Sequence, residues 1–178
     1  MLSNGTIRLR ALEVDDLDML YLWENDTSSW RDGNNIAPFS RRMLAEYIDT
    51  YDGDIFKSQQ LRLMIVDVAT DVAVGMIDLY DFDAINRRAG IGIIIDEAHR
   101  GKGYAAAAIG LLCRYCHQRL GIHQLYAVTA IDNTASVALF QNCGFNISGK
   151  LRSWLRYGER YVDAYIHQRL LIADSALH

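Results

Sequence analysis

The chain has 178 residues, of which 51% are hydrophobic, and its formal net charge at pH 7 is −4. This length and apolar content predict one globular domain over residues 1–178, with a core at about 6–171. The charge gives no basic face for nucleic acid, and no apolar run approaches the ~20 residues of a membrane span. Residues 1–5 lack the features of a signal peptide, so a cytoplasmic location is expected.

The cysteines and histidines predict neither a disulfide framework nor a metal site. The cysteines number three, an odd count, and Cys113 and Cys116 form a C-x-x-C spacing deep inside a predicted helix. A redox pair is expected at a helix N-terminus, so core packing is the preferred interpretation. The five histidines are scattered without metal-ligand spacing.

The first half of the chain predicts a strand, two helices and two further strands. A strand is expected at 6–11, and acidic residues at 13–16 open a helix that ends near Asn25. A polar loop at 26–40, containing Trp30 and Phe39, leads to Ser40, which is expected to cap a second helix. The two strands are expected at 61–68 and 72–83, joined by a turn at Thr70 and Asp71.

The second half predicts a central strand at 90–95, a glycine-rich turn and a long helix with apolar spacing as far as Leu120. A strand at 124–130 follows the helix, so it should run parallel to the central strand through a right-handed crossover. Further elements are expected at 133–142, a short helix, and at 146–157 and 160–171, a hairpin. The order of elements indicates a mixed α/β fold.

The turn before the long helix has the chemistry of an anion site. The first N–H groups of a helix have no internal partner and carry a partial positive charge. Gly101 and Gly103 let the backbone approach a bulky anion, and Arg100 and Lys102 add full positive charge. The turn therefore predicts a phosphate or pyrophosphate cradle.

The turn partly resembles two other phosphate-binding motifs. Residues 101–106 fit the G-x-G-x-x-A dinucleotide fingerprint, but the chain around them shows no regular β/α alternation. The P-loop spacing is absent, because Tyr104 follows Lys102 and Gly103 where that motif needs Ser or Thr.

Two motifs resemble those of the GCN5-related N-acetyltransferase (GNAT) family. Arg100-x-x-Gly103-x-Ala105 is similar to the family's [Q/R]-x-x-G-x-[G/A] turn, and the segment 133–145, which ends in Gly-Phe, resembles its second motif. The resemblance covers about 6–170 and extends to bacterial spermidine N-acetyltransferases and ribosomal-protein N-terminal acetyltransferases. It implies a mixed, mostly antiparallel seven-stranded sheet with helices on both faces and a splayed central parallel pair of strands.

The resemblance also implies acetyl-CoA as co-substrate, lying between the strands at 91–95 and 124–130, with no metal. Asn133 is expected to contact it, although Asn is equally a favoured helix cap. The cofactor-binding residues expected in this way are Ile93, Ile94, Ile95, Arg100, Gly101, Lys102, Gly103, Tyr104, Ala105, Ala106, Asn133 and Ser136.

The resemblance assigns only some of the catalytic roles to residues of this chain. The backbone N–H of Ile93 is expected to polarise the thioester carbonyl. The tyrosine that usually donates a proton to the thiolate is replaced by Phe140, which has none to give. Candidate substitutes for that donor are Cys143, Tyr80, Tyr104, Tyr126 and Ser136.

Acidic residues on the strand before the central one are the candidates for the catalytic base or for the acid that orients the amine. Asp81 falls where the spermidine enzymes carry an acceptor-site glutamate, and Asp78 lies among apolar residues, so it needs a partner if it is buried. Asp83 is on the same strand. Those enzymes also carry acidic residues at the position of Gly90 and in the loop at 34–38, where this chain has none. The polycation pocket is thus only partly present.

The sequence therefore predicts an acetyl-CoA-dependent N-acetyltransferase that acts on a primary amine, a small amine or a polyamine such as spermidine. A protein N-terminal acetyltransferase and a non-catalytic CoA-binding sensor remain alternatives. A homo-oligomer is possible, and neither nucleic acid nor a membrane is expected as a partner.

Overall fold

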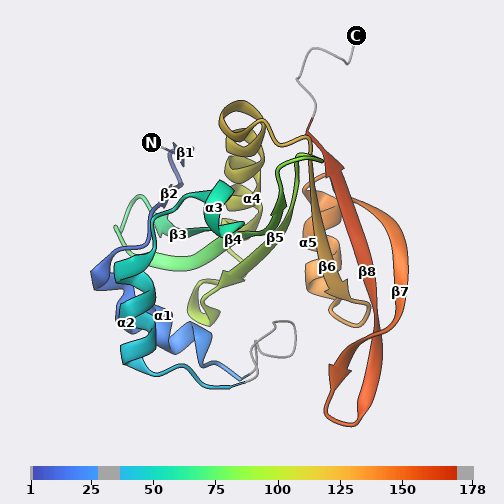
Figure 1. Ribbon diagram of the computed structural model, residues 1–178, viewed down its shortest axis with the longest axis horizontal. Coiled ribbons are helices and arrows are strands. Elements are labelled where there is room, and N and C mark those ends of the chain that lie inside the picture. Colours follow the sequence, from blue (N-terminus) through green and yellow to red (C-terminus); the bar gives the residue numbers. More distant parts are fainter. Residues whose placement is uncertain (1, 28–36, 172–178) are drawn as a thin grey trace.

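The computed structural model describes residues 2–27 and 37–171, so most of the predicted loop, including Trp30, lies outside the described residues. One eight-stranded sheet, ordered β1-β2-β3-β4-β5-β6-β8-β7, has helices on both faces (Figure 1). The strands are β1 (Leu2–Ser3), β2 (Ile7–Arg10), β3 (Leu61–Asp67), β4 (Ala73–Asp83), β5 (Arg88–Ile95), β6 (Gln124–Ala130), β7 (Asn146–Tyr157) and β8 (Arg160–Leu170). The predicted mixed sheet is confirmed, with the two-residue β1 as an additional edge strand.

The helices also follow the predicted order. They are α1 (Leu17–Glu24), α2 (Arg41–Thr50), α3 (Ile55–Ser58), α4 (Tyr104–Tyr115) and α5 (Thr134–Asn142), with 3₁₀ turns at Val14–Asp16 and Glu97–His99 and a π-helical turn at Cys116–Leu120. The short α3 was not predicted. No helix among the described residues is long and apolar enough to cross a membrane.

The predicted caps are present and explain where two helices begin. The hydroxyl of Ser40 accepts a hydrogen bond from the Met43 N–H at 3.2 Å. The side-chain oxygen of Asn133 accepts one from the Ser136 N–H at 3.1 Å. Each cap satisfies an N–H group that the helix itself leaves unpaired.

Two hydrophobic clusters hold the helices on the sheet. Strand residues Ile65 and Ile77 point to one face and pack with Ile109 of α4. Their neighbours Met64 and Met76 point to the other face, where they meet α1 and α2. Because successive side chains of β3 and β4 point to opposite faces, the two strands contribute apolar residues to the clusters on both faces of the sheet.

The cysteine pair belongs to the cluster under α4. Cys113 and Cys116 are both buried there. Burial raises the pKa of the Cys113 thiol to about 11 and that of Cys116 still further. The core-packing interpretation of the C-x-x-C spacing is therefore confirmed.

The centre of the sheet is forked. β5 and β6 are parallel but pair only over Arg88↔Gln124, Ala89↔Leu125 and Gly90↔Tyr126. β5 stays paired with β4 as far as Ile95, while β6 continues alongside β8. From Ile91 onward no described residue pairs with the β6 side of β5, and Figure 1 shows the two strands diverging. The predicted splayed pair is confirmed.

Candidate active site

The turn that follows β5 has the geometry expected of an anion cradle. Gly101 and Gly103 have φ of 76° and 81°, and a Cβ built on either residue would meet no heavy atom within 4 Å. No side chain caps α4, so its first N–H groups remain available. Arg100 and Lys102 are exposed beside these groups. This donor set fits the pyrophosphate of a CoA molecule.

Side chains fasten the turn to the elements on both sides. The hydroxyl of Tyr104 donates to the carboxylate of Asp67 at the end of β3. The Asp96 carboxylate accepts from Trp23 Nε1 at 3.2 Å and bonds His99 Nδ1 at 3.0 Å. The bonds to His99 and Trp23 lower the pKa of Asp96. Because its hydroxyl is bound to Asp67, Tyr104 is a poor candidate for the missing proton donor.

The remaining expected cofactor residues lie on the two sides of the fork. Ile93, Ile94 and Ile95 form the end of β5, and Ala105 and Ala106 are in the first turn of α4. Asn133 and Ser136 are joined to each other at the start of α5. The cap explains Asn133 structurally, and its contact with the co-substrate stays a prediction.

Phe140, at the position of the family tyrosine, is part of the core. Its ring packs edge-on against Phe145 at 5.2 Å between centroids and lies 5.8 Å from the ring of His167. His167 is fully buried, and its Nε2 is 2.8 Å from the Thr129 hydroxyl oxygen. His167 Nδ1 has no hydrogen-bond partner among the described residues. Burial lowers the pKa of His167.

Another candidate donor, Cys143, is half-buried, and burial raises the pKa of its thiol. Tyr80 and Tyr126 instead stand at the fork, with their rings edge to face at 5.9 Å between centroids. Both are paired with Gly90, one from each neighbouring strand. Burial, as the largest cause, raises the pKa of each hydroxyl.

The three candidate acids have different surroundings. Asp83 accepts from the N–H groups of Ile85 and Asn86 at 3.1 and 2.9 Å and pairs with Arg88 at 3.2 Å. These contacts shape the turn between β4 and β5. Asp83 is therefore committed to local structure.

Asp78 has the partner that its apolar neighbours required. Arg62 of β3 donates to both of its carboxylate oxygens, at 2.9 and 2.7 Å, and also to Glu24 of α1 at 2.6 Å. Burial opposes the charge of Arg62, but Asp78 and Glu24 outweigh it and raise the pKa of Arg62. Neither Arg62 nor Glu24 is among the residues predicted from the sequence, although Glu24 is an acid at the end of an otherwise apolar helix and so needs a partner where it is buried.

Of the three candidate acids, only Asp81 is exposed to solvent. It lies in a bulge of β4, where the register shifts between Tyr80 and Asp83, and its φ is 49°. Within residues 2–27 and 37–171, no Lys or Arg forms an ion pair with it. Its charge helps to raise the pKa of the Tyr126 hydroxyl. The left-handed backbone is uncommon for a residue other than glycine and is often found at functional sites.

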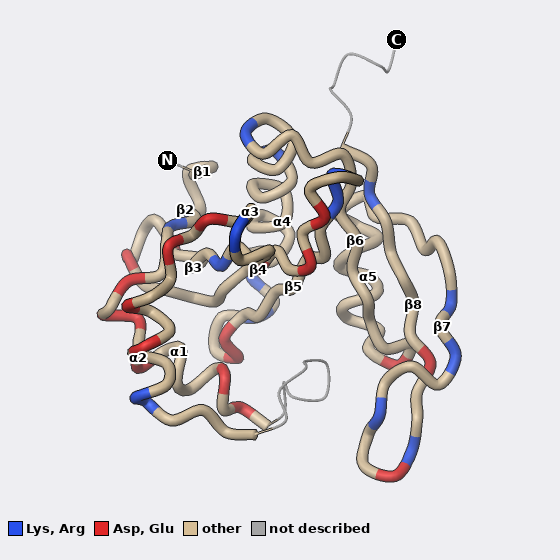
Figure 2. Tube along the Cα trace, in the orientation of Figure 1, with Lys and Arg blue, Asp and Glu red and all other residues tan. Residues whose placement is uncertain are grey.

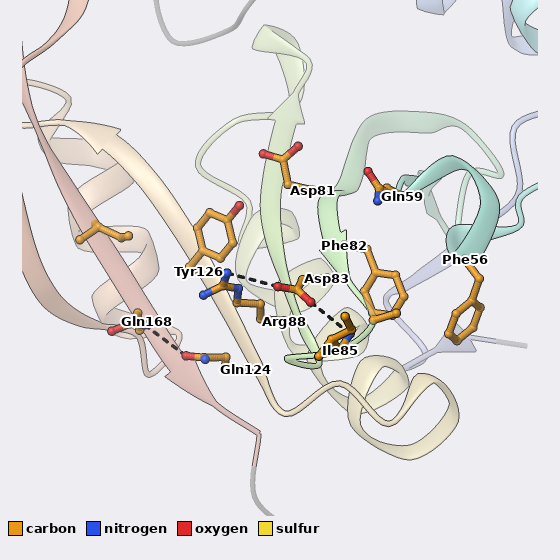
Figure 3. A pocket seen from close by; sticks show the side chains of 12 residues that line it. Phe56, Gln59, Asp81, Phe82, Asp83, Ile85, Arg88, Gln124, Tyr126 and Gln168 are labelled. Atoms are coloured by element: carbon orange, nitrogen blue, oxygen red, sulfur yellow. Dashed lines mark hydrogen bonds and ion pairs between the residues drawn. The ribbon is translucent and has the colours of Figure 1, made fainter.

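Asp81 stands at the rim of an open hollow of about 620 Å³. The hollow lies between the β4–β5 turn, α3 and the neighbouring strands β6 and β8, and Figure 3 shows Asp81 and Tyr126 on neighbouring strands among the residues that line it. Gln59, the residue that follows α3, and Gln168 of β8 line it as well. A carboxylate, amides and aromatic rings around one opening suit an amine ligand.

Comparison with known proteins settles the family. The acetyltransferase (GNAT) domain model matches residues 6–146. The chain belongs to the GNAT family. It is an acetyl-CoA-dependent N-acetyltransferase, as the motifs at 100–105 and 133–145 implied.

Two relatives illustrate the range of this family. Spermidine N(1)-acetyltransferase from Vibrio cholerae is 29% identical over 175 residues, covering 97% of this chain and 95% of that protein. A putative ribosomal N-acetyltransferase, YdaF, from Bacillus subtilis is 36% identical over 152 residues, covering 83% of this chain and 76% of that protein.

Solved structures of a V. cholerae spermidine N-acetyltransferase share the fold. In complex with CoA and spermine, that enzyme matches with a TM-score of 0.84 and 28% identity, over 94% of this chain and 97% of that one. A dodecameric structure of the V. cholerae enzyme matches with a TM-score of 0.77.

Proposed function

We propose that this chain transfers the acetyl group of acetyl-CoA to a primary amine of a small aliphatic polyamine, with spermidine as the first candidate. The observation that carries the proposal is Asp81, an exposed carboxylate beside the fork that lacks a cationic partner among the described residues. An ammonium group of the acceptor would supply that partner. The spermidine N-acetyltransferases among the relatives support the same class of acceptor.

The distribution of charge supports a cationic acceptor. Figure 2 shows acidic residues gathered around α1 and α2 and the loops beside them, and basic residues along the β7–β8 hairpin. The exposed acids of the first group include Glu13, Asp15, Asp18, Glu46, Asp49 and Asp52. Such a field draws a polyamine toward the side of the molecule that bears α1 and α2.

The residues around the fork would divide the binding of acetyl-CoA between them. The free edge of β5 at Ile93 to Ile95 takes the pantetheine arm, and the turn at 100–106 takes the pyrophosphate. Asn133 and Ser136, at the start of α5, are the proposed contacts on the other side of the fork. When bound, acetyl-CoA supplies an acetyl group activated as a thioester, and the Ile93 N–H is the proposed donor to its carbonyl oxygen.

Asp81 is assigned to bind and orient the acceptor through an ammonium group. Asp78 is assigned a structural role, because both of its oxygens are occupied by Arg62. The reacting nitrogen must be the free amine, so its proton leaves before attack. No donor replaces the tyrosine at Phe140 in this proposal, since a thiol with a pKa of about 8.5 is a tolerable leaving group.

The experiment is thiol release from acetyl-CoA with spermidine, spermine, putrescine, an aminoglycoside and short peptides with free N-termini. The proposal expects turnover with the polyamines and a product acetylated on a primary amine. Turnover with peptides alone would establish protein N-terminal acetylation instead. Binding of acetyl-CoA without turnover of any amine would favour the sensor alternative.

A further inference from the structure

The Tyr80 ring fills the space next to Gly90 on one face of the sheet. They stand opposite each other in the β4–β5 pairing. A Cβ built on Gly90 would lie 2.2, 2.4 and 2.7 Å from Cε2, Cζ and Cδ2 of the Tyr80 ring. On Gly92, two residues farther along the same face, it would lie 3.9 Å from Cε1. The Tyr80 ring therefore lies over β5 where a side chain of residue 90 would otherwise project.

This ring stands at the base of the fork. Gly90↔Tyr126 is the last pair that joins β5 to β6. Tyr126 meets the Tyr80 ring edge to face, at an interplanar angle of 83°, and lines the hollow together with Asp81. The Tyr80 ring thus lies against Tyr126 where β5 and β6 part, and Tyr126 in turn shares the hollow with Asp81.

The bulge in β4 places Asp81 beside these rings. In a regular strand, neighbouring residues point to opposite faces, and Asp81 would point away from the face that carries Tyr80. The register shift between Tyr80 and Asp83 breaks the alternation, and the φ of 49° at Asp81 belongs to the same distortion. The aromatic ring and the carboxylate are therefore brought to one side by the backbone.

We propose that Tyr80 determines which amines this enzyme accepts. Its ring, together with that of Tyr126, contacts the methylene segment of the acceptor, while Asp81 binds an ammonium at the far end. The substrate class is an aliphatic amine with a second ammonium separated from the reacting one by methylenes. Burial of each methylene against the rings favours the longer spacer until the second ammonium reaches Asp81. This inference rests on the proposed function.

The test compares kcat/KM for α,ω-diamines of increasing length with that for the matching monoamines. Tyr80→Ala is expected to lower kcat/KM at least about tenfold for the preferred diamine, through the KM for amine, and to flatten the dependence on length. The KM for acetyl-CoA should not change. Tyr80→Phe keeps the ring and is expected to keep the dependence on length.

Tyr161→Ala is the matched control, because it removes the same atoms at an exposed position of β8. An equal loss for every amine, with a raised KM for acetyl-CoA, would overturn the inference, since it would mark Tyr80 as a general structural residue. Loss of the length dependence in Tyr80→Phe would also overturn it, because the hydroxyl would then be responsible.

A pair of stability measurements keeps the inference testable if Tyr80→Ala folds poorly. Gly90→Ala should lower the thermal midpoint, and Tyr80→Ala/Gly90→Ala should recover much of that loss, because the new Cβ then has room. If the decreases in thermal midpoint of the two single variants simply add in the double variant, the Tyr80 ring and a Cβ at residue 90 do not compete for the same space. A wild-type enzyme without amine turnover would instead defeat the proposed function itself, whereas an active wild type with an unaffected Tyr80→Ala would defeat only this inference.

Discussion

At the scale of single residues, a buried histidine lies against the phenylalanine that replaces the family tyrosine. His167 contacts the Phe140 ring, bonds the Thr129 hydroxyl and is fully buried. The sequence analysis noted His167 only as one of several scattered histidines. Its burial follows from the pairing of β8 with β6, which places Ala127 opposite His167, and a single sequence does not contain that register.

The lowered pKa of His167 predicts a pH-dependent stability. The unfolded chain titrates near 6.5 and the folded chain lower, so this contribution is fully present above about 6.5. It is lost as the pH falls toward the folded value, with a slope of up to about 1.4 kcal/mol per pH unit. Denaturant unfolding between pH 7 and 5 should show this slope.

Two variants test this prediction. His167→Met removes the buried histidine, and His123→Gln, at an exposed position, is the control. His167→Met should flatten the slope, because the group that titrates is gone. His123→Gln should leave the slope as in the wild type. An unchanged slope in His167→Met would place the pH dependence elsewhere.

At the scale of elements, the ion pairs that join different strands, helices and turns differ sharply in burial. The Arg62 and Asp78 side chains are 13% and 18% exposed, whereas Asp71, paired with Arg8, is 73% exposed. Removing one partner of a buried pair leaves an uncompensated charge, while an exposed pair contributes little. The loss of free energy of unfolding when one partner is removed should therefore be larger for the buried pair than for the exposed one.

Asp78→Asn is expected to lower the free energy of unfolding by about 3 kcal/mol. Asp71→Asn is the matched control and should change it by less than about 1 kcal/mol. Urea titration at pH 7 measures both. Similar losses in the two variants would show that Glu24 compensates Arg62 once Asp78 is neutral.

The two glycines of α4 predict opposite effects of the same substitution. Gly103 has φ of 81° at the start of the helix, whereas Gly110 lies inside it, and a Cβ there would meet nothing within 4 Å. Gly110→Ala should raise the free energy of unfolding by about 0.5–1 kcal/mol. Gly103→Ala should lower it by about 1–2 kcal/mol, because an L-residue is strained there.

Only Gly103→Ala should also weaken acetyl-CoA binding, since it alters the turn at 100–106. Isothermal titration with acetyl-CoA tests this difference. Equal affinities for the two variants would remove the turn from the proposed binding site.

At the scale of the whole molecule, the order of elements was predictable from sequence patterns, and the splayed strands from the family resemblance. Alternation and helical spacing locate β6 and α5, and glycines and cations locate the turn at 100–103. The family motifs then supplied the fold, because they fix which strands lie beside the fork.

The sequence did not predict how the acceptor face is assembled. Arg62 joins Asp78 to Glu24 across three elements, and the bulge at Asp81 changes which face that residue uses. Both depend on pairing register and on long-range contacts, which local periodicity does not encode. The filling of the Gly90 space by Tyr80 depends on the same register.

The most direct test of the account is CoA release with spermidine by the wild type and by Asp81→Asn. Asparagine accepts the left-handed conformation at φ 49°, so the substitution removes the charge and keeps the backbone. We expect turnover by the wild type and an increase of about tenfold or more in the KM for spermidine in Asp81→Asn, with the KM for acetyl-CoA unchanged. Equal KM values for spermidine in the two proteins, or no turnover of any amine, would contradict it.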